Sequence, residues 1–464
     1  VYKRQKKTFT KFVIYTIILL GVTSTFTGCQ SIETPPPNEL LVDDAIKTTD
    51  DLQRLLNASY NEVANTFGGF APLMSEMQSD NLSMPNNNDL KELYSHNVLF
   101  FNTTSGSFYS ILYRAIFRAN FVQDNMDKVA DLSAADKDRM MGEIKFIRAL
   151  CHFTAVRMYA KPYGFSAKNE HPGIAVVLKS STKPNPRLSV GEAYDAILAD
   201  LKDAENLLPA ENGNYADKMS ATALLAHVYF QMGKYTDAAT QASTVIDSKK
   251  YTLSDTVNLF TPAASSEHIF KIVSTGVNDK RSGGYSDNYS PGNPTCQLSK
   301  ALWESLKVDL ATDKRLKLLT VVNAGAQNEF IKSEMFNAPY FNVPVLHLTQ
   351  MHLIRAEALA KSGGDLTVAT ADINAIIKRA YTDNSKIVAA GSTAQQIIDA
   401  TRTQRRIELL FQGDRTNEIK RLGAIESQNL YVRGHRWDCD GFVLQFPITE
   451  KTSIFDINPT GGCN

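Results

Sequence analysis

Hydrophobic and polar residues recur with helical spacing along most of this chain. Residues 48–67 (TTDDLQRLLNASYNEVANTF) begin with Thr and Asp, which favour a helix start, and continue with apolar residues three and four positions apart. The residues of that apolar face are Leu52, Leu55, Leu56 and Tyr60. The same pattern predicts three further helices, over residues 107–129, 133–160 and 189–209. The chain is therefore predicted to be mainly α-helical.

Strand-like alternation is rare in this sequence. The best short candidates are residues 267–273 (EHIFKIV) and residues 442–448 (FVLQFPI). We expect few short strands and no large sheet.

A spaced repeat of small residues refines the fold class. Two segments carry Ala, a larger apolar residue, Gly and Ala at offsets 0, 3, 7 and 13. They are Ala226, Tyr229, Gly233 and Ala239, and then Ala356, Leu359, Gly363 and Ala369. Alanines suit the contact between two antiparallel helices, and glycine suits the tight turn that joins them. We interpret each segment as a tetratricopeptide-like helix pair, the alternative being two unrelated helical hairpins. Because the copies start 130 residues apart, other helix pairs and long loops are expected between them.

The first 28 residues have the pattern of a bacterial export signal. Five Lys and Arg residues and no acid precede an apolar run, Phe12 to Val22, that is shorter than the roughly twenty residues of a spanning helix. The run leads to Phe26-Thr27-Gly28-Cys29, which resembles the lipobox of lipoproteins, where the cysteine is diacylated and becomes the new N-terminus. Two acyl chains give stable anchoring. A plain signal peptide with a chance cysteine is the alternative.

Composition then bounds the mature protein. The Pro-rich segment that follows Cys29, up to residue 40, is interpreted as an extended tether, and residues 41–464 as a single domain. The whole chain has 49 basic and 49 acidic residues, and the leader holds five of the bases, so the mature part carries a net charge near −5. Nucleic acid is not an expected partner, because binding to phosphates normally requires a basic face.

The sequence carries little sign of metal or catalytic chemistry. Cys151, Cys296, Cys439 and Cys463 form no CxxC pair, and a Cys439–Cys463 disulfide and unpaired buried thiols are both open. His347 and His352 lie five residues apart, which misses the helical spacing of metal ligands. Asp438 and Asp440 supply only part of a calcium loop. No nucleophile elbow, Walker A loop or HExxH helix occurs. No cofactor, metal or catalytic residue is therefore predicted.

Several segments, in order, resemble the SusD/RagB family of outer-membrane nutrient-binding lipoproteins of Bacteroidota. The resemblance rests on residues 143–164, 186–209, 221–253, 343–364, 401–423 and 442–459. It implies a SusD-like domain built from tetratricopeptide-like helix pairs and long ligand-binding loops. It also implies a SusC-like TonB-dependent transporter as partner and a lipid-anchored position on the outer membrane, facing the cell exterior.

The late charged segment of this resemblance has a structural interpretation. Arg405, Arg406, Glu408 and Arg415 surround Gly413, where Gln404 and Gln412 replace the glutamates usual in the family. We interpret Gly413 as a helix C-cap and the charges as ion pairs to a neighbouring helix, with a ligand role as the alternative.

Two polar loops are the best candidates for ligand binding. Residues 280–296 hold Tyr285, Asp287, Asn288 and Tyr289 in a Gly- and Ser-rich context typical of surface loops. Tyrosine rings there would stack on a sugar or pack on a peptide while the polar residues supply hydrogen bonds; the alternative is that the tyrosines anchor the loop to the domain. In the N-terminal loop the candidates are Asp80, Asn81 and Tyr94. Trp303 is expected in the core, and Trp437 is left open.

The predicted function is capture of an oligosaccharide outside the cell and its delivery to the transporter, without bond cleavage. A peptide ligand within the same family is the near alternative. A surface glycoside hydrolase, which needs paired carboxylates in a cleft, and a scaffold that binds only protein are the alternatives from other classes.

Overall fold

The computed structural model describes residues 46–181 and 183–463. The predicted export signal, Cys29 and the predicted tether lie outside these residues. Residues 48–464 form one compact unit, and the account below concerns that unit. Among the residues that the structure describes, none of the helices is long and apolar enough to cross a membrane.

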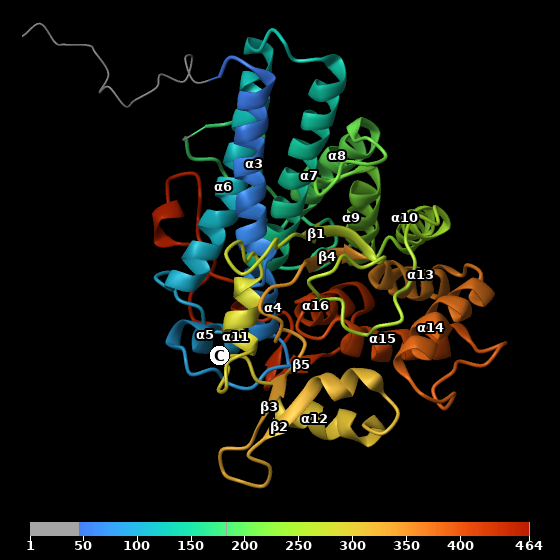
Figure 1. Cartoon of the computed structure of the whole chain (residues 1–464). Coiled ribbons are helices and arrows are strands. Elements are labelled where there is room, and N and C mark those ends of the chain that lie inside the picture. The colour runs from blue at the N-terminus through green and yellow to red at the C-terminus, as the bar shows by residue number, and fades with distance from the viewer. Residues whose placement is uncertain (1–45, 182, 464) are drawn as a thin grey trace, which may run out of the picture. The chain divides into compact units, whose positions relative to one another are not determined.

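Long helices make up the N-terminal half (Figure 1). They are α3 (Thr49–Phe67), α6 (Thr103–Asn125), α7 (Ala134–Tyr159) and α8 (Val190–Leu207). Each begins after a residue whose side chain accepts a hydrogen bond from the first turn, such as Thr48, Asn102 and Ser133. These four helices stack directly on one another: α3 packs on α6, α6 on α7 and α7 on α8. The four helices predicted from periodicity are confirmed.

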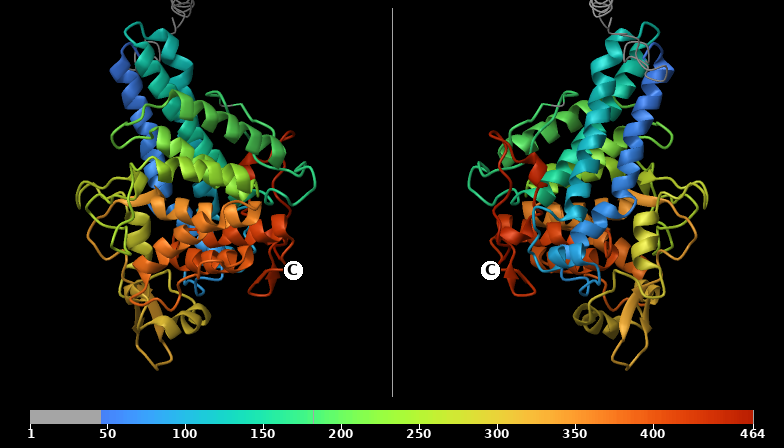
Figure 2. Two further views of the ribbon diagram at one scale, coloured as in Figure 1. Left: turned by 90° about the vertical axis from the view of Figure 1, so that its right-hand side faces the viewer. Right: turned by 90° about the vertical axis from the view of Figure 1, so that its left-hand side faces the viewer.

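The two repeats are helix pairs, as predicted. The first is α9 (Lys218–Gln231) with α10 (Tyr235–Asp247), and the second is α13 (Leu348–Ser362) with α14 (Leu366–Ala380). Gly233 and Gly363 occupy the turns with φ of +70° and +71°, a conformation that glycine adopts without steric cost. Despite their separation in the sequence, the pairs lie side by side, because α10 packs on α13 (Figures 1 and 2).

The segment between the pairs differs from the expectation. Long loops are present, but no further pair of long helices lies there among the described residues. The segment holds two seven-residue helices, α11 (Gly283–Tyr289) and α12 (Lys300–Leu306). Its strands are β1 (His268–Ile272), β2 (Leu319–Val322), β3 (Phe330–Ser333) and β4 (Val343–His347).

The strands form three small antiparallel sheets in the described part of the chain. β1 pairs with β4, β2 pairs with β3, and β5 (Tyr431–Val432) pairs with β6 (His435–Arg436). The predicted strand at residues 267–273 is therefore confirmed as β1. The one at residues 442–448 is wrong: there the N–H of Leu444 donates to the Met158 carbonyl, and the Gln445 side chain bonds the backbone of Asn458, so the segment packs without a partner strand.

The remaining helices include the two that carry the charged residues around Gly413. They are α4 (Phe70–Gln78), α5 (Asn88–Tyr94), α15 (Ala394–Glu408) and α16 (Asp414–Glu426). Short 3₁₀ turns lie at Met126–Lys128, Lys307–Asp309, Lys314–Leu318, Asp440–Phe442 and Ile448–Glu450. Gly413 has φ of +78°, but it precedes α16 and does not end α15, which corrects the expected C-cap.

The charges around Gly413 form ion pairs with other segments, as predicted. Glu408 accepts from Arg315 and Arg379, and Arg405 bonds Asp414 at 2.6 Å. Trp303 is buried as expected, and Trp437 is also buried, with its ring against Gly423. At Gly423 a Cβ would lie 2.3 Å from that ring, so only glycine allows the contact.

Candidate ligand-binding face

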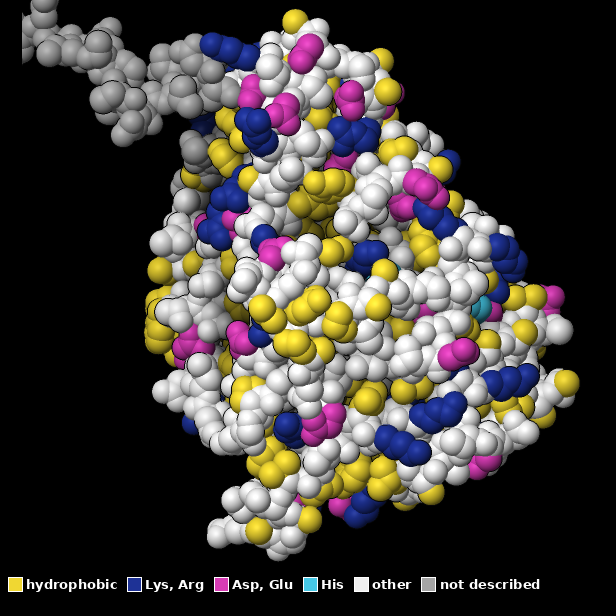
Figure 3. Space-filling view, viewed as in Figure 1, with side chains coloured by type: hydrophobic (Ala, Val, Ile, Leu, Met, Phe, Trp, Pro, Cys, Tyr) yellow, Lys and Arg dark blue, Asp and Glu magenta, His cyan; other side chains and the backbone are white. Residues whose placement is uncertain are grey.

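Three segments far apart in the sequence meet at one surface, which we call the loop face. It consists of residues 79–97 after α4, residues 280–299 around α11, and the β5–β6 hairpin, residues 431–436. Main-chain bonds join the first two segments, from the N–H of Ser83 to the Gln297 carbonyl and from the N–H of Ser299 to the Asn81 carbonyl. Figure 1 shows α4, α5, α11 and β5 close together on this side of the molecule. In the space-filling view basic and acidic side chains are interspersed (Figure 3).

Paired glycines allow α11 to dock beside α4. A Cβ at Gly69 would lie 2.3 Å from the Tyr285 nitrogen, and a Cβ at Gly284 would lie 2.9 Å from the Gly69 Cα. The two backbones therefore approach as closely as glycine alone permits. Gly284 of the predicted binding loop thus serves this packing contact.

Tyr285 and Tyr289 point into the domain, which corrects the expectation that their rings face a ligand. Their side chains are 2% and 0% exposed, and their ring centroids lie 4.7 Å and 5.2 Å from that of Phe336. The physical reason is that a short helix forms where an irregular loop was expected, and its apolar side is turned to the core. The buried positions of the two tyrosines agree with the alternative interpretation, in which they anchor the loop to the domain.

The polar residues of the same loop lie further out. Asp287 is exposed and forms an ion pair with Lys280 at 3.3 Å. Asn288 is half-buried, and its side-chain nitrogen donates to the Gly284 carbonyl at 2.8 Å. Of the two, only the Asp287 carboxylate is open to solvent.

Asp80 and Asn81 are engaged within the protein. The Asp80 carboxylate bonds Arg415 at 2.8 Å and Arg406 at 3.0 Å. Burial acts to raise the pKa of Asp80, but the Arg415 hydrogen bond and the two positive charges outweigh it and hold the pKa below its ordinary value. Asn81 is buried and donates to Glu76 at 2.9 Å. Asp80 and Asn81 therefore join the loop face to arginines of α15 and α16.

Tyr94 lies at the end of α5 with one face of its ring covered. The Arg433 guanidinium sits 3.8 Å from the ring centroid, and Arg433 Nε donates to the Tyr94 carbonyl at 2.9 Å. The same guanidinium donates to the Met77 carbonyl at 3.2 Å and also to that of Ser79, the last carbonyls of α4. Arg433 thus attaches the hairpin to two helix ends, where a cation is favoured by the helix dipole.

The β5–β6 hairpin carries the exposed aromatic side chain that the sequence reasoning missed. Tyr431 is 55% exposed and pairs across the hairpin with Arg436, which is also exposed. A signal was available in Arg433-Gly434, whose positive φ values of +50° and +84° form the turn, but strands of two residues give no alternation to detect.

The partial calcium loop is occupied by ion pairs. Asp438 pairs with Arg436, and Asp440 pairs with Lys161 at 2.9 Å. The Cys439–Cys463 disulfide is present, whereas Cys151 and Cys296 are buried thiols whose pKa values burial raises. His347 and His352 bond Gln412 and Asp372 and belong to the packing of α13.

A cavity of about 110 Å³ lies beneath the loop face, between α4, α7, α9, β4 and the start of α16. Arg157, His227, Gln350 and Asp414 are among its lining residues. Ligand pockets usually enclose about 300 Å³ or more, so this space is too small for a saccharide of several rings. This cavity is therefore not a site for such a ligand.

This architecture, with helix pairs as a framework and long loops gathered on one surface, defines a helix-rich binding protein. A family described as "Starch-binding associating with outer membrane" matches residues 33–230, and the SusD family matches residues 312–438. The chain belongs to the SusD/RagB family, a carbohydrate-binding family associated with the outer membrane.

Individual relatives agree with this assignment. SusD-like protein P38 of Formosa agariphila is 24% identical over 323 residues, which are 65% of this chain and 62% of that protein. The match thus spans less than two thirds of the relative. A SusD superfamily structure from Bacteroides thetaiotaomicron shares the fold with a TM-score of 0.77 at 21% identity, covering 89% of this chain and 100% of that one. A laminarin-binding SusD-like protein aligns with a TM-score of 0.66 at 20% identity, covering 89% and 100%.

Proposed function

We propose that this protein is a lipid-anchored glycan-binding protein of the cell surface that captures an oligosaccharide on its loop face. Family membership supports the class of ligand. The single observation that supports the location is Tyr431, whose ring is exposed on a hairpin that Arg433 attaches to α4 and α5. A tyrosine ring that is exposed on a fixed hairpin offers an apolar surface to the face of a sugar. Its hydroxyl group can form a hydrogen bond with a sugar hydroxyl.

Polar neighbours would orient the sugar in this proposal. Arg436 lies across the hairpin from Tyr431, and the exposed Asp287 carboxylate and the Tyr94 hydroxyl belong to the same face. Asp80, Asn81 and Asn288 would act indirectly, by holding neighbouring groups. No covalent step is involved, so binding and release alone describe the mechanism.

Glycan binding by a Tyr431→Ala variant tests the ligand site. Binding to a panel of soluble polysaccharides, measured by calorimetry, should fall about fivefold or more, because one stacking contact of an aromatic ring contributes about 1–3 kcal/mol. Tyr431→Phe should retain most of it. Phe117→Ala removes another exposed aromatic side chain, 37% exposed and on α6, and is the control.

Three outcomes would contradict the ligand class, the non-catalytic role or the site. Binding of peptides with no response to any glycan would favour the peptide-binding alternative. Release of new reducing ends from a bound glycan would establish hydrolysis and overturn the non-catalytic proposal. Unchanged glycan affinity in Tyr431→Ala would move the site elsewhere.

Anchoring and delivery complete the proposal. Cys29 would carry the acyl chains, and a TonB-dependent transporter would receive the ligand. Cys29→Ala should move the protein from the membrane fraction to the soluble fraction, and affinity purification of the wild type from detergent-solubilised outer membrane should recover a large transporter. Membrane association that survives Cys29→Ala would contradict the anchor.

A further inference from the structure

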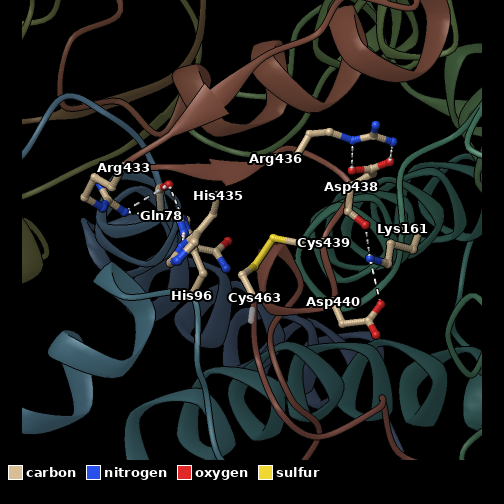
Figure 4. The surroundings of a disulfide bond; sticks show 10 residues. All are labelled: Gln78, His96, Lys161, Arg433, His435, Arg436, Asp438, Cys439, Asp440 and Cys463. Carbon is tan, nitrogen blue, oxygen red and sulfur yellow. Dashed lines mark hydrogen bonds and ion pairs between the residues drawn. A yellow bond between two sulfur atoms is a disulfide. The ribbon is translucent and has the colours of Figure 1, made fainter.

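Two histidines and a disulfide meet beside the loop face (Figure 4). His96 Nδ1 lies 3.0 Å from His435 Nδ1. One ligand atom each of His96, His435 and Cys463 all lie within 4.8 Å of one another, and the sulfur of Cys439 is bonded to that of Cys463. Two imidazoles and two sulfurs are therefore gathered from segments that are distant in the sequence.

The His96 ring is oriented as in a metal site. Its Nε2 lies 2.8 Å from the Gln78 carbonyl and donates its hydrogen there, which leaves the Nδ1 lone pair facing His435. Metal-ligating histidines typically donate their second ring N–H to a carbonyl or carboxylate in this way. The ring also stacks on Phe442, with centroids 4.1 Å apart, so it is held from a second side.

Contacts other than the disulfide hold the remaining ligands. The N–H of Cys463 donates to the His96 carbonyl at 3.1 Å, and the N–H of Cys439 donates to the Arg436 carbonyl at 3.1 Å. Gly441 fits against both the His96 carbonyl and Cys463, where a Cβ would lie 1.7 Å from the oxygen and 2.9 Å from the sulfur. The sulfurs should therefore stay near the histidines when the bond between them is broken.

We propose that reduction of the Cys439–Cys463 disulfide creates a Zn²⁺ site of two thiolates and the two imidazoles of His96 and His435. Two molecules of a low-molecular-weight thiol together supply two electrons and two protons, are oxidised to one disulfide, and leave Cys439 and Cys463 as thiols. Zn²⁺ then displaces both thiol protons. Tetrahedral Cys₂His₂ coordination is the common structural arrangement for zinc, with Zn–S of about 2.3 Å and Zn–N of about 2.0 Å.

Local charge explains why the site needs the thiols. An Arg433 nitrogen lies 3.3 Å from His96 Nε2, so a divalent ion held by the two imidazoles alone would face a nearby cation. Two thiolates cancel the charge of the ion. The disulfide offers no such charge, so the oxidised protein should not hold zinc here.

Cobalt substitution tests the proposal on the wild-type protein. After reduction with a phosphine and removal of the reductant, one equivalent of Co²⁺ should give thiolate-to-cobalt charge-transfer bands and tetrahedral d–d bands, which Zn²⁺ then removes by displacement. The oxidised protein should give neither. His435→Ala should weaken Zn²⁺ binding more than about tenfold, since even an indirect partner of a ligand has that effect. His171→Ala, a change of another partly buried histidine, should not.

Alkylation provides a readout that does not depend on the spectrum. Zn²⁺ should protect Cys439 and Cys463 of the reduced protein from iodoacetamide, whereas the buried Cys151 and Cys296 should stay unmodified with or without zinc, provided that circular dichroism shows the helices intact. Loss of the helical signal on reduction would overturn the proposal. So would cobalt bands in the oxidised protein, or bands that persist unchanged in His435→Ala.

Discussion

The arginines of the helix-pair framework and Arg433 of the loop face have different kinds of partner. In the framework Glu357, which is fully buried, accepts from both Arg402 and Arg421 at 2.8 Å. On the loop face the described partners of Arg433 are main-chain carbonyls and the rings of His96 and Tyr94. Burial lowers the pKa of Arg433 to about 10.

This difference distinguishes the part of the molecule that supports the fold from the part that is proposed to bind a ligand. In the framework the carboxylate of Glu357 pairs with the guanidinium groups of Arg402 and Arg421. Arg433 instead uses helix ends and an aromatic ring to hold the hairpin, so the outer side of that hairpin, with Tyr431 and Arg436, stays open. Glu76 joins the two regions, because it accepts from the Gly413 N–H at 2.9 Å and from Asn81.

The largest effect is expected from breaking the framework cluster. Glu357→Gln keeps the shape of the side chain but leaves Arg402 and Arg421 without their shared carboxylate, which should cost about 3–5 kcal/mol of unfolding free energy. Urea unfolding followed by circular dichroism measures it. Glu304→Gln, in a half-exposed pair with Lys307 on α12, is the matched control and should change stability by less than about 1 kcal/mol. Equal losses of unfolding free energy in the two variants would contradict the predicted difference between the buried cluster and the half-exposed pair.

The next effect concerns Glu76 and pH. Burial raises the pKa of Glu76 from 4.5 to about 7. Between these values the folded state keeps a proton that the unfolded state has lost, so this residue's contribution to the unfolding free energy falls as pH rises and is lost above about 7. The total change is up to about 3 kcal/mol, at about 1.4 kcal/mol per unit of pKa.

Glu76→Gln isolates this contribution, because glutamine does not titrate. Relative to the wild type, the variant should gain stability as pH is raised from about 5 to about 8 in urea titrations. A difference between the two proteins that does not change with pH would contradict the predicted titration.

Local spacing explains which parts of the fold could be predicted. The helix pairs follow from Ala226, Gly233 and their counterparts, since both the helix contact and the turn depend on residues close in sequence. That α10 packs on α13 depends on pairing between distant segments, and no local pattern encodes it. The strand predicted at residues 442–448 was wrong for the same reason, since its hydrogen bonds go to residues such as Met158.

The sequence identified two of the three segments of the loop face, but not how their side chains are placed. Composition identified residues 280–296 as a loop segment, but it could not show which side of α11 faces the core, and so Tyr285 and Tyr289 were expected outside. Asp80 was named as a ligand-binding candidate, whereas its partners Arg406 and Arg415 lie more than 300 positions away. The hairpin residues Tyr431 and Arg436 were missed altogether.

The smallest effect is expected from releasing the hairpin. Arg433→Ala removes the donor to the end of α4 and to Tyr94, which should cost about 1–2 kcal/mol, the upper range for a partly buried cation at a helix C-terminus. Most of the change should be local, so amide exchange should speed up in residues 76–80 and 431–436 before the framework helices respond. Arg436→Ala, on the same hairpin with an exposed side chain, should leave exchange unchanged and is the control. The contrary result would be that Arg433→Ala accelerates amide exchange equally in α9, α10, α13 and α14. The loop face and the framework would then unfold as one unit, and the different partners of their arginines would have no consequence for how the hairpin is held.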